Sequence, residues 1–82
     1  MALFLGMHDM GGPSTDEETQ ANWSKYKAAA GKRGSKGLRV HYNSAKGKAF
    51  CLTEADSEDQ VRAAHQDANI PLNDVLEVNI SE

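Results

Sequence analysis

Residues 38–54 read LRVHYNSAKGKAFCLTE and contain the only cysteine of the chain. The alternation of apolar and polar residues on both sides of a central turn predicts a β-hairpin. The turn is the informative part, because Ala45-Lys46-Gly47 fits a three-residue loop in which a type I turn is followed by glycine in the left-handed conformation. We therefore expect two antiparallel strands that flank residues 45–47.

The length of this loop decides which side chains share a face of the hairpin. A three-residue loop pairs Tyr42 with Phe50 and places His41 directly opposite Cys51. An even-numbered loop would instead pair Val40 with Cys51 and mix apolar with polar residues on both faces. Because register follows the face that can be buried, we expect the odd loop, with a histidine facing the cysteine.

The chain has 82 residues and one cysteine, which predicts a single domain over residues 1–82 without an intrachain disulfide. A lone cysteine is typical of a reducing compartment. The N-terminus lacks the basic region and the long apolar run of a signal peptide, and no segment approaches the length of a membrane span. We expect a soluble cytoplasmic protein with no membrane partner.

The formal net charge of −3 hides an asymmetry along the chain. Eight of the nine basic residues lie in the segment Lys25–Lys48, Arg62 being the ninth, and all twelve acids lie outside that segment. Such a block can form an anion or nucleic-acid patch, but it also fits a solvated helix end and loop. No nucleic-acid-binding motif accompanies the charge, so we expect no nucleic-acid partner.

The elements follow the order strand, helix, strand, strand, helix, strand. We expect strands over residues 2–8 and 74–80 around the hairpin, and helices over residues 16–30 and 57–68, each preceded by capping-box residues. This order is typical of the α+β, ferredoxin-like βαββαβ fold. Two right-handed crossovers place both helices on one face of a four-stranded antiparallel sheet with strand order 4-1-3-2.

One face of the predicted sheet is much more apolar than the other, and we expect the helices to cover it. The residues expected on this covered face are Leu3, Leu5, Met7, Leu38, Val40, Tyr42, Phe50, Leu52, Leu76, Val78 and Ile80. The open face keeps a mixture of polar and apolar side chains, which suggests that something covers it. We expect a homodimer that packs sheet on sheet through the open face.

The predicted open face brings together the side chains that could bind a metal ion. His8, His41 and Cys51 lie on one side of neighbouring strands, and imidazole and thiolate are ligands for zinc, nickel or copper. A carboxylate such as Glu54 could complete the set, although Glu54 could also cap helix amides or act as a base. His65 lies beside the buried stripe of the second helix and fits either a structural role or a ligand. Ordinary packing of the cysteine and a cofactor-free active site remain as alternatives.

The segment FCLTEA at residues 50–55, together with a helical histidine at residue 65, resembles a family of small bacterial proteins of unknown function whose best-known member binds nickel. The first strand ending in His8 and the turn at residues 46–48 are similar to that family as well. The resemblance implies a ferredoxin-like fold, homodimerisation, and a nickel ion held by histidine, cysteine and oxygen ligands.

The matching positions in this chain are His8, Cys51, Glu54 and His65. The chain departs from the family pattern at Asn69, where many members have a second helical histidine, and His41 could compensate. We expect a protein that binds a transition metal, nickel in the first place, for sequestration or sensing rather than catalysis. The alternative is a cofactor-free enzyme or small-molecule binding module of the dimeric α+β barrel type.

Overall fold

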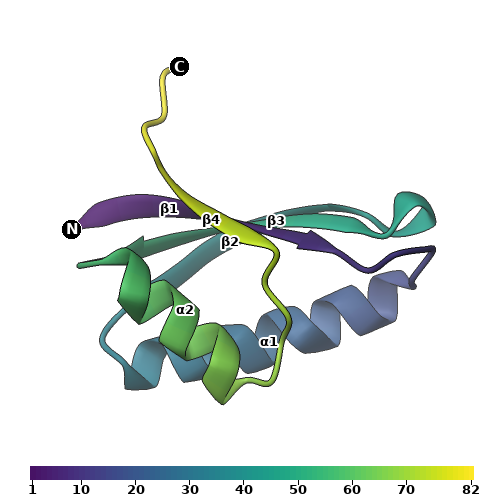
Figure 1. The fold of residues 1–82 in the computed structure, drawn as a ribbon, viewed down its shortest axis with the longest axis horizontal. Helices are drawn as coiled ribbons and strands as arrows, with labels where there is room; N and C mark the ends of the chain where they lie inside the picture. Colours follow the sequence, from purple (N-terminus) through teal and green to yellow (C-terminus); the bar gives the residue numbers. More distant parts are fainter.

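The structure, a computed structural model that describes residues 1–82, is a four-stranded sheet with two helices on one side (Figure 1). The elements are β1 (Ala2–Asp9), α1 (Asp16–Lys32), β2 (Lys36–Asn43), β3 (Lys48–Ala55), α2 (Glu58–Asp67) and β4 (Asp74–Val78). All strand pairs are antiparallel and the order across the sheet is β2-β3-β1-β4. This confirms the predicted ferredoxin-like fold. Neither helix is long and apolar enough to cross a membrane.

Both helices begin at the predicted capping residues. The hydroxyl of Thr15 accepts the backbone N–H of Glu18 at 3.1 Å, and the hydroxyl of Ser57 accepts that of Gln60 at 3.2 Å. These bonds satisfy amides that have no partner inside the helix. Helix α1 continues through Gly31 to Lys32, two residues beyond its predicted end at residue 30. No steric or dihedral constraint on Gly31 forces a break there.

The hairpin register differs from the prediction. Residues 44–46 form a short 3-10 helix and Gly47 follows in the left-handed conformation, so the loop has four residues and Asn43 pairs with Lys48. Tyr42 therefore pairs with Ala49 rather than Phe50, and Val40 rather than His41 lies opposite Cys51. The left-handed glycine was predicted correctly, but the extra loop residue shifts the pairing by one position.

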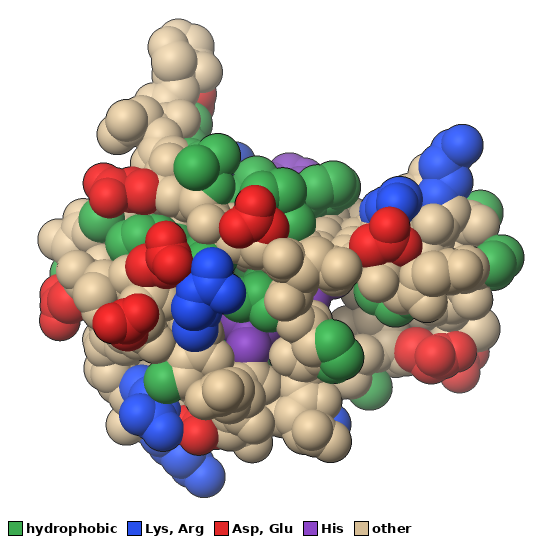
Figure 2. Space-filling model, in the orientation of Figure 1, with side chains coloured by type: hydrophobic (Ala, Val, Ile, Leu, Met, Phe, Trp, Pro, Cys, Tyr) green, Lys and Arg blue, Asp and Glu red, His purple; other side chains and the backbone are tan.

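The faces of β1, β3 and β4 are also reversed, whereas Val40 and Tyr42 of β2 lie on the helix side as predicted. The helix side receives small side chains and one phenylalanine from β1, β3 and β4: Phe4, Gly6, Ala49, Cys51, Thr53, Ala55 and Val75. The larger apolar side chains predicted for the core, among them Leu5, Phe50 and Leu76, lie on the face without helices, and Leu76 is 55% exposed. Figure 2 shows hydrophobic side chains gathered along the upper rim, where Figure 1 places the sheet.

The reversal follows from how closely the helices approach the sheet. Helix α1 presents Tyr26 and α2 presents His65, and both side chains are almost fully buried. A Cβ atom added at Gly6 would lie 2.7 Å from Cys51 Sγ and 3.5 Å from the His65 ring. The space between the helices and the sheet thus has no room for a leucine at position 6 of β1. The small side chains of the central strands therefore face the helices.

The hairpin turn provides a test of this packing. Gly47 has a φ of 64°, and a side chain there would collide with the carbonyl oxygen of Gly12 in the loop after β1. We expect Gly47→Ala to lower the free energy of unfolding by at least about 2 kcal/mol, because left-handed strain and a backbone clash add. The matched control is Gly31→Ala, which meets open space in a helix and should leave stability unchanged or raise it by up to about 1 kcal/mol. Urea denaturation measures both values, and equal effects of the two changes would contradict the assignment.

Candidate metal centre

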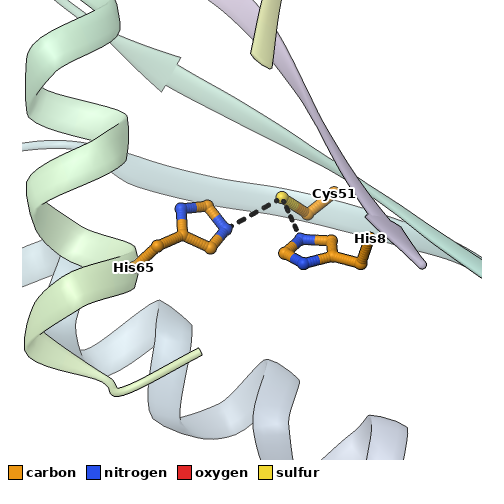
Figure 3. A group of neighbouring side chains, drawn as sticks. All are labelled: His8, Cys51 and His65. Atoms are coloured by element: carbon orange, nitrogen blue, oxygen red, sulfur yellow. Dashed lines mark hydrogen bonds between the residues drawn. The ribbon is translucent and has the colours of Figure 1, made fainter. Parts of the chain in front are cut away.

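Three side chains from three different elements converge beneath the sheet. His8 comes from the end of β1, Cys51 from the middle of β3 and His65 from the last turn of α2, and Figure 3 shows the two rings pointing at the sulfur atom. Cys51 Sγ lies 3.5 Å from Nε2 of His8 and 3.5 Å from Nε2 of His65. One ligand atom from each residue lies within 4.8 Å of the other two.

Backbone carbonyls orient both histidine rings. Nδ1 of His8 lies 2.8 Å from the carbonyl oxygen of Pro71, and Nδ1 of His65 lies 2.8 Å from that of Val61. A carbonyl can only accept, so each Nδ1 carries the proton and donates it. Each Nε2 of the neutral ring is then left with a lone pair directed at the sulfur. Such second bonds fix the tautomer and orientation of metal-binding histidines.

Burial keeps the three groups uncharged in the metal-free protein. Desolvation lowers the pKa of His65 to about 4, and the neighbouring His8 ring contributes to this shift. Burial also lowers the pKa of His8, against a raising effect of its bond to Pro71. The pKa of the Cys51 thiol is raised to about 11, chiefly by burial. A protonated thiol is a poor nucleophile, so the pair Cys51 and His8 does not resemble an activated catalytic dyad.

The cluster has more acceptors than protons. The thiol of Cys51 carries one hydrogen and can donate it to only one of the two Nε2 atoms, which leaves the other lone pair without a donor from this cluster. A cation bound by thiolate and both rings would satisfy all three atoms. At the metal–ligand distances of zinc sites, a sulfur and a nitrogen on a tetrahedral ion are about 3.6 Å apart, close to the spacing found here. The donor chemistry suits nickel, copper or zinc and not magnesium or calcium.

Other residues support the cluster, and sequence reasoning did not identify their role. The Tyr26 ring lies 4.1 Å from the His65 ring between centroids, and the Tyr26 hydroxyl bonds to the buried Thr53 hydroxyl at 2.5 Å. Trp23 follows at 5.9 Å from Tyr26. The sequence alone did not indicate that Tyr26 lies beside His65. Gly6 carried a usable signal, because a glycine inside a strand often marks a close approach.

The structure brings His8, Cys51 and His65 together and places the other two candidates elsewhere. His41 pairs with Phe50, and Glu54 pairs with Leu3 and Lys36. Since side chains alternate along a strand, both lie on the face opposite to Cys51. The prediction that His41 faces the cysteine is wrong because of the shifted hairpin register. The cluster also lies between sheet and helices, and not on the open face as we expected.

A cavity of about 320 Å³ adjoins the three ligand atoms. Its walls combine apolar side chains, including Trp23, Val40 and Ile70, with polar ones near the entrance, including Asn22 and Asn73. Figure 2 shows histidine atoms recessed between the surrounding surface residues near the centre of this view. The candidate ligands are therefore reachable from the helix side through a partly apolar space.

Comparison with known proteins now places the chain. A family model described as "Nickel responsive protein SCO4226-like" matches residues 4–78. The chain belongs to this family. The crystal structure of SCO4226 from Streptomyces coelicolor A3(2) superposes with a TM-score of 0.90 at 21% identity, covering 99% of this chain and 100% of that one. At this identity the likeness establishes the fold alone. None of the curated proteins matches the chain significantly.

The buried neutral histidines lead us to expect that acid destabilises the protein. The pKa of His65 is about 4 in the folded protein against an ordinary value of 6.5, so the unfolded chain binds the proton more tightly. The contribution of neutral His65 to the free energy of unfolding is therefore fully present above pH 6.5 and is lost as the pH falls toward 4. For the metal-free protein we expect the free energy of unfolding to fall by about 2 kcal/mol from His65 alone between pH 7.5 and pH 5.

Chemical denaturation in the presence of a chelator at the two pH values measures this loss. His65→Gln should reduce the loss, whereas His41→Gln, which removes an exposed histidine from the other face, should retain it. A loss of equal size in His65→Gln and in the unmodified protein would contradict the assignment.

Proposed function

We propose that this protein binds a transition metal ion, nickel in the first place, through His8, Cys51 and His65. The observation that carries the proposal is the convergence of two imidazole lone pairs on one thiol, each ring held by a backbone carbonyl. The description of the family as nickel responsive favours nickel among the metals that suit these ligands.

The surroundings of the site favour sequestration or sensing over catalysis. Binding converts the Cys51 thiol to thiolate and releases its proton, so affinity should fall on acidification. The ligands come from β1, β3 and α2, so a bound ion would join a helix to two central strands and stabilise the fold. A protein whose folded state depends on the metal in this way can report or store it. We place it in the cytoplasm, where a reduced cysteine persists.

Calorimetric titration with Ni²⁺ tests the ligand assignment. We expect one ion per chain, and we expect Cys51→Ser, His8→Gln and His65→Gln each to weaken binding by at least about 100-fold, since each removes one of three ligands. The matched controls are His41→Gln and Glu54→Gln, which remove candidate ligands from the opposite face and should bind like the unmodified protein. Unchanged binding in Cys51→Ser, or loss of binding in His41→Gln, would contradict the assignment.

We also propose that two chains pack through their open sheet faces. This face carries an apolar patch, with Leu5, Leu52 and Phe50 on the two central strands and Leu76 on the edge strand β4, and the polar residues Arg39, His41, Glu54 and Asp74 lie around it. Phe50 is 38% and Leu76 is 55% exposed in the single chain. An apolar centre with a polar rim is the usual anatomy of an interface between subunits, and a sheet face pairs naturally with a copy of itself.

Analytical ultracentrifugation tests the dimer. We expect a species of twice the 8.9 kDa chain mass at micromolar concentration. Phe50→Glu and Leu76→Glu should each produce monomers, because a charge on the apolar centre would be buried without a partner. Ala28→Glu introduces the same side chain on the exposed surface of α1 and should remain dimeric. A monomeric unmodified protein would contradict this part of the proposal.

The cavity beside the cluster favours a second candidate function, a small-molecule binding module. A concave, partly apolar space with a few convergent polar groups is the usual form of a ligand site. The high pKa of the Cys51 thiol speaks against cofactor-free chemistry that uses this cysteine as nucleophile.

A further inference from the structure

The cavity is larger than a bare metal ion requires. Its volume is about 320 Å³, whereas a water molecule takes about 30 Å³ in the liquid, so the space could hold about ten waters. The ligand atoms of His8, Cys51 and His65 lie at its wall. An ion bound there would keep an accessible side, and the cavity would surround whatever occupies that side.

The walls facing this accessible side are suited to a flat apolar molecule. Trp23 and Tyr26 contribute neighbouring rings with an interplanar angle of 31°, and Val40 and Ile70 contribute aliphatic surface. The Trp23 ring packs closely against Gly37 of β2, where an added Cβ would lie 3.0 Å from it. Such rigid apolar walls favour an organic ring over loosely held water.

The charges of the site indicate which sign of charge a ligand in the cavity would carry. A divalent ion with one thiolate and two neutral imidazoles carries a net charge of +1 beside the largely apolar walls of the cavity, and an anionic occupant of its accessible side would neutralise that charge. The one carboxylate at the cavity, Asp9, is already paired with Lys48 at 2.6 Å. At the entrance, Asn73 accepts the Asp9 backbone N–H through its side-chain oxygen, and its amide nitrogen is a donor suited to an anionic group.

We propose that the metal is taken up as a complex with a small monoanionic chelator, an aromatic ring that carries a carboxylate next to a donor atom. The ring would lie among Trp23, Tyr26 and Ile70, and its two donor atoms would complete the coordination of the ion. This inference rests on the proposed metal site and names the second component that the same site would hold.

Equilibrium dialysis with picolinate as probe tests the inference on the full chain. Three samples contain nickel alone, picolinate alone, and the one-to-one nickel–picolinate complex. We expect one picolinate retained per chain in the third sample and none in the second, with a shift of the nickel absorption bands when picolinate joins the bound ion.

Substitutions at the cavity separate its role from that of the metal ligands. Asn22 is exposed and lies at the cavity wall, so Asn22→Trp should fill the space and lower picolinate retention at least tenfold without changing nickel uptake. Ala28→Trp places the same side chain on α1 outside the cavity and should behave like the unmodified protein. Trp23→Ala, which removes a wall, is a second test if Asn22→Trp does not fold.

The outcomes distinguish failure of the inference from failure of the proposed function. Nickel uptake without picolinate retention, or removal of nickel by picolinate, overturns the inference and leaves the metal site standing. A protein that retains the nickel–picolinate complex but takes up no nickel in the absence of picolinate supports the inference. The same result contradicts binding of the bare ion. A protein that retains neither nickel nor the complex overturns both, and equal retention in Asn22→Trp overturns the cavity assignment.

Discussion

The structure depends on the close contact between the centre of β1 and the cysteine beside it. Gly6 lies against Cys51 Sγ and the His65 ring, with no space for a Cβ atom. This contact lets α2 approach the sheet closely enough for a helical histidine to reach a strand cysteine. A larger residue at position 6 would push the helix outward and separate the ligand atoms. The packing of the fold and the geometry of the site therefore depend on the same contact.

The same constraint determines which side of the sheet is left without cover. Because mainly small residues of β1, β3 and β4 face the helices, alternation along these three strands sends their larger apolar side chains outward. The result is a sheet whose exposed face contains Phe50 and Leu76, an arrangement that is costly for a single chain in water. A small domain that uses its inner face for a polar cluster buries little apolar surface of its own. Packing of the outer face against a second copy would bury more apolar surface and so add hydrophobic stabilisation.

Burial keeps the three candidate ligands of the cluster neutral while their positions are fixed. Desolvation lowers the pKa of both histidines and raises that of the thiol, so the metal-free site is neutral. Backbone carbonyls hold each ring through Nδ1 and leave Nε2 directed inward. Binding of a cation would then require the loss of one proton from Cys51, with both Nε2 atoms already directed at its sulfur. The adjoining cavity determines what else can reach the ion.

Periodicity and capping residues determined the order of elements and both helix starts, because these depend on local chemistry. The strand order followed from that element order and the right-handed crossovers it requires. The candidate ligands His8, Cys51 and His65 could also be named from their residue types and from the family resemblance. The register of the hairpin could not, because Gly47 takes the left-handed conformation in either loop length and so does not distinguish them. The burial rule then selected the wrong face, since it assumes that one chain buries its own most apolar surface. Tertiary contact between α2 and the small residues of β1 and β3 decided which face is covered, and with it that His65 rather than His41 joins Cys51.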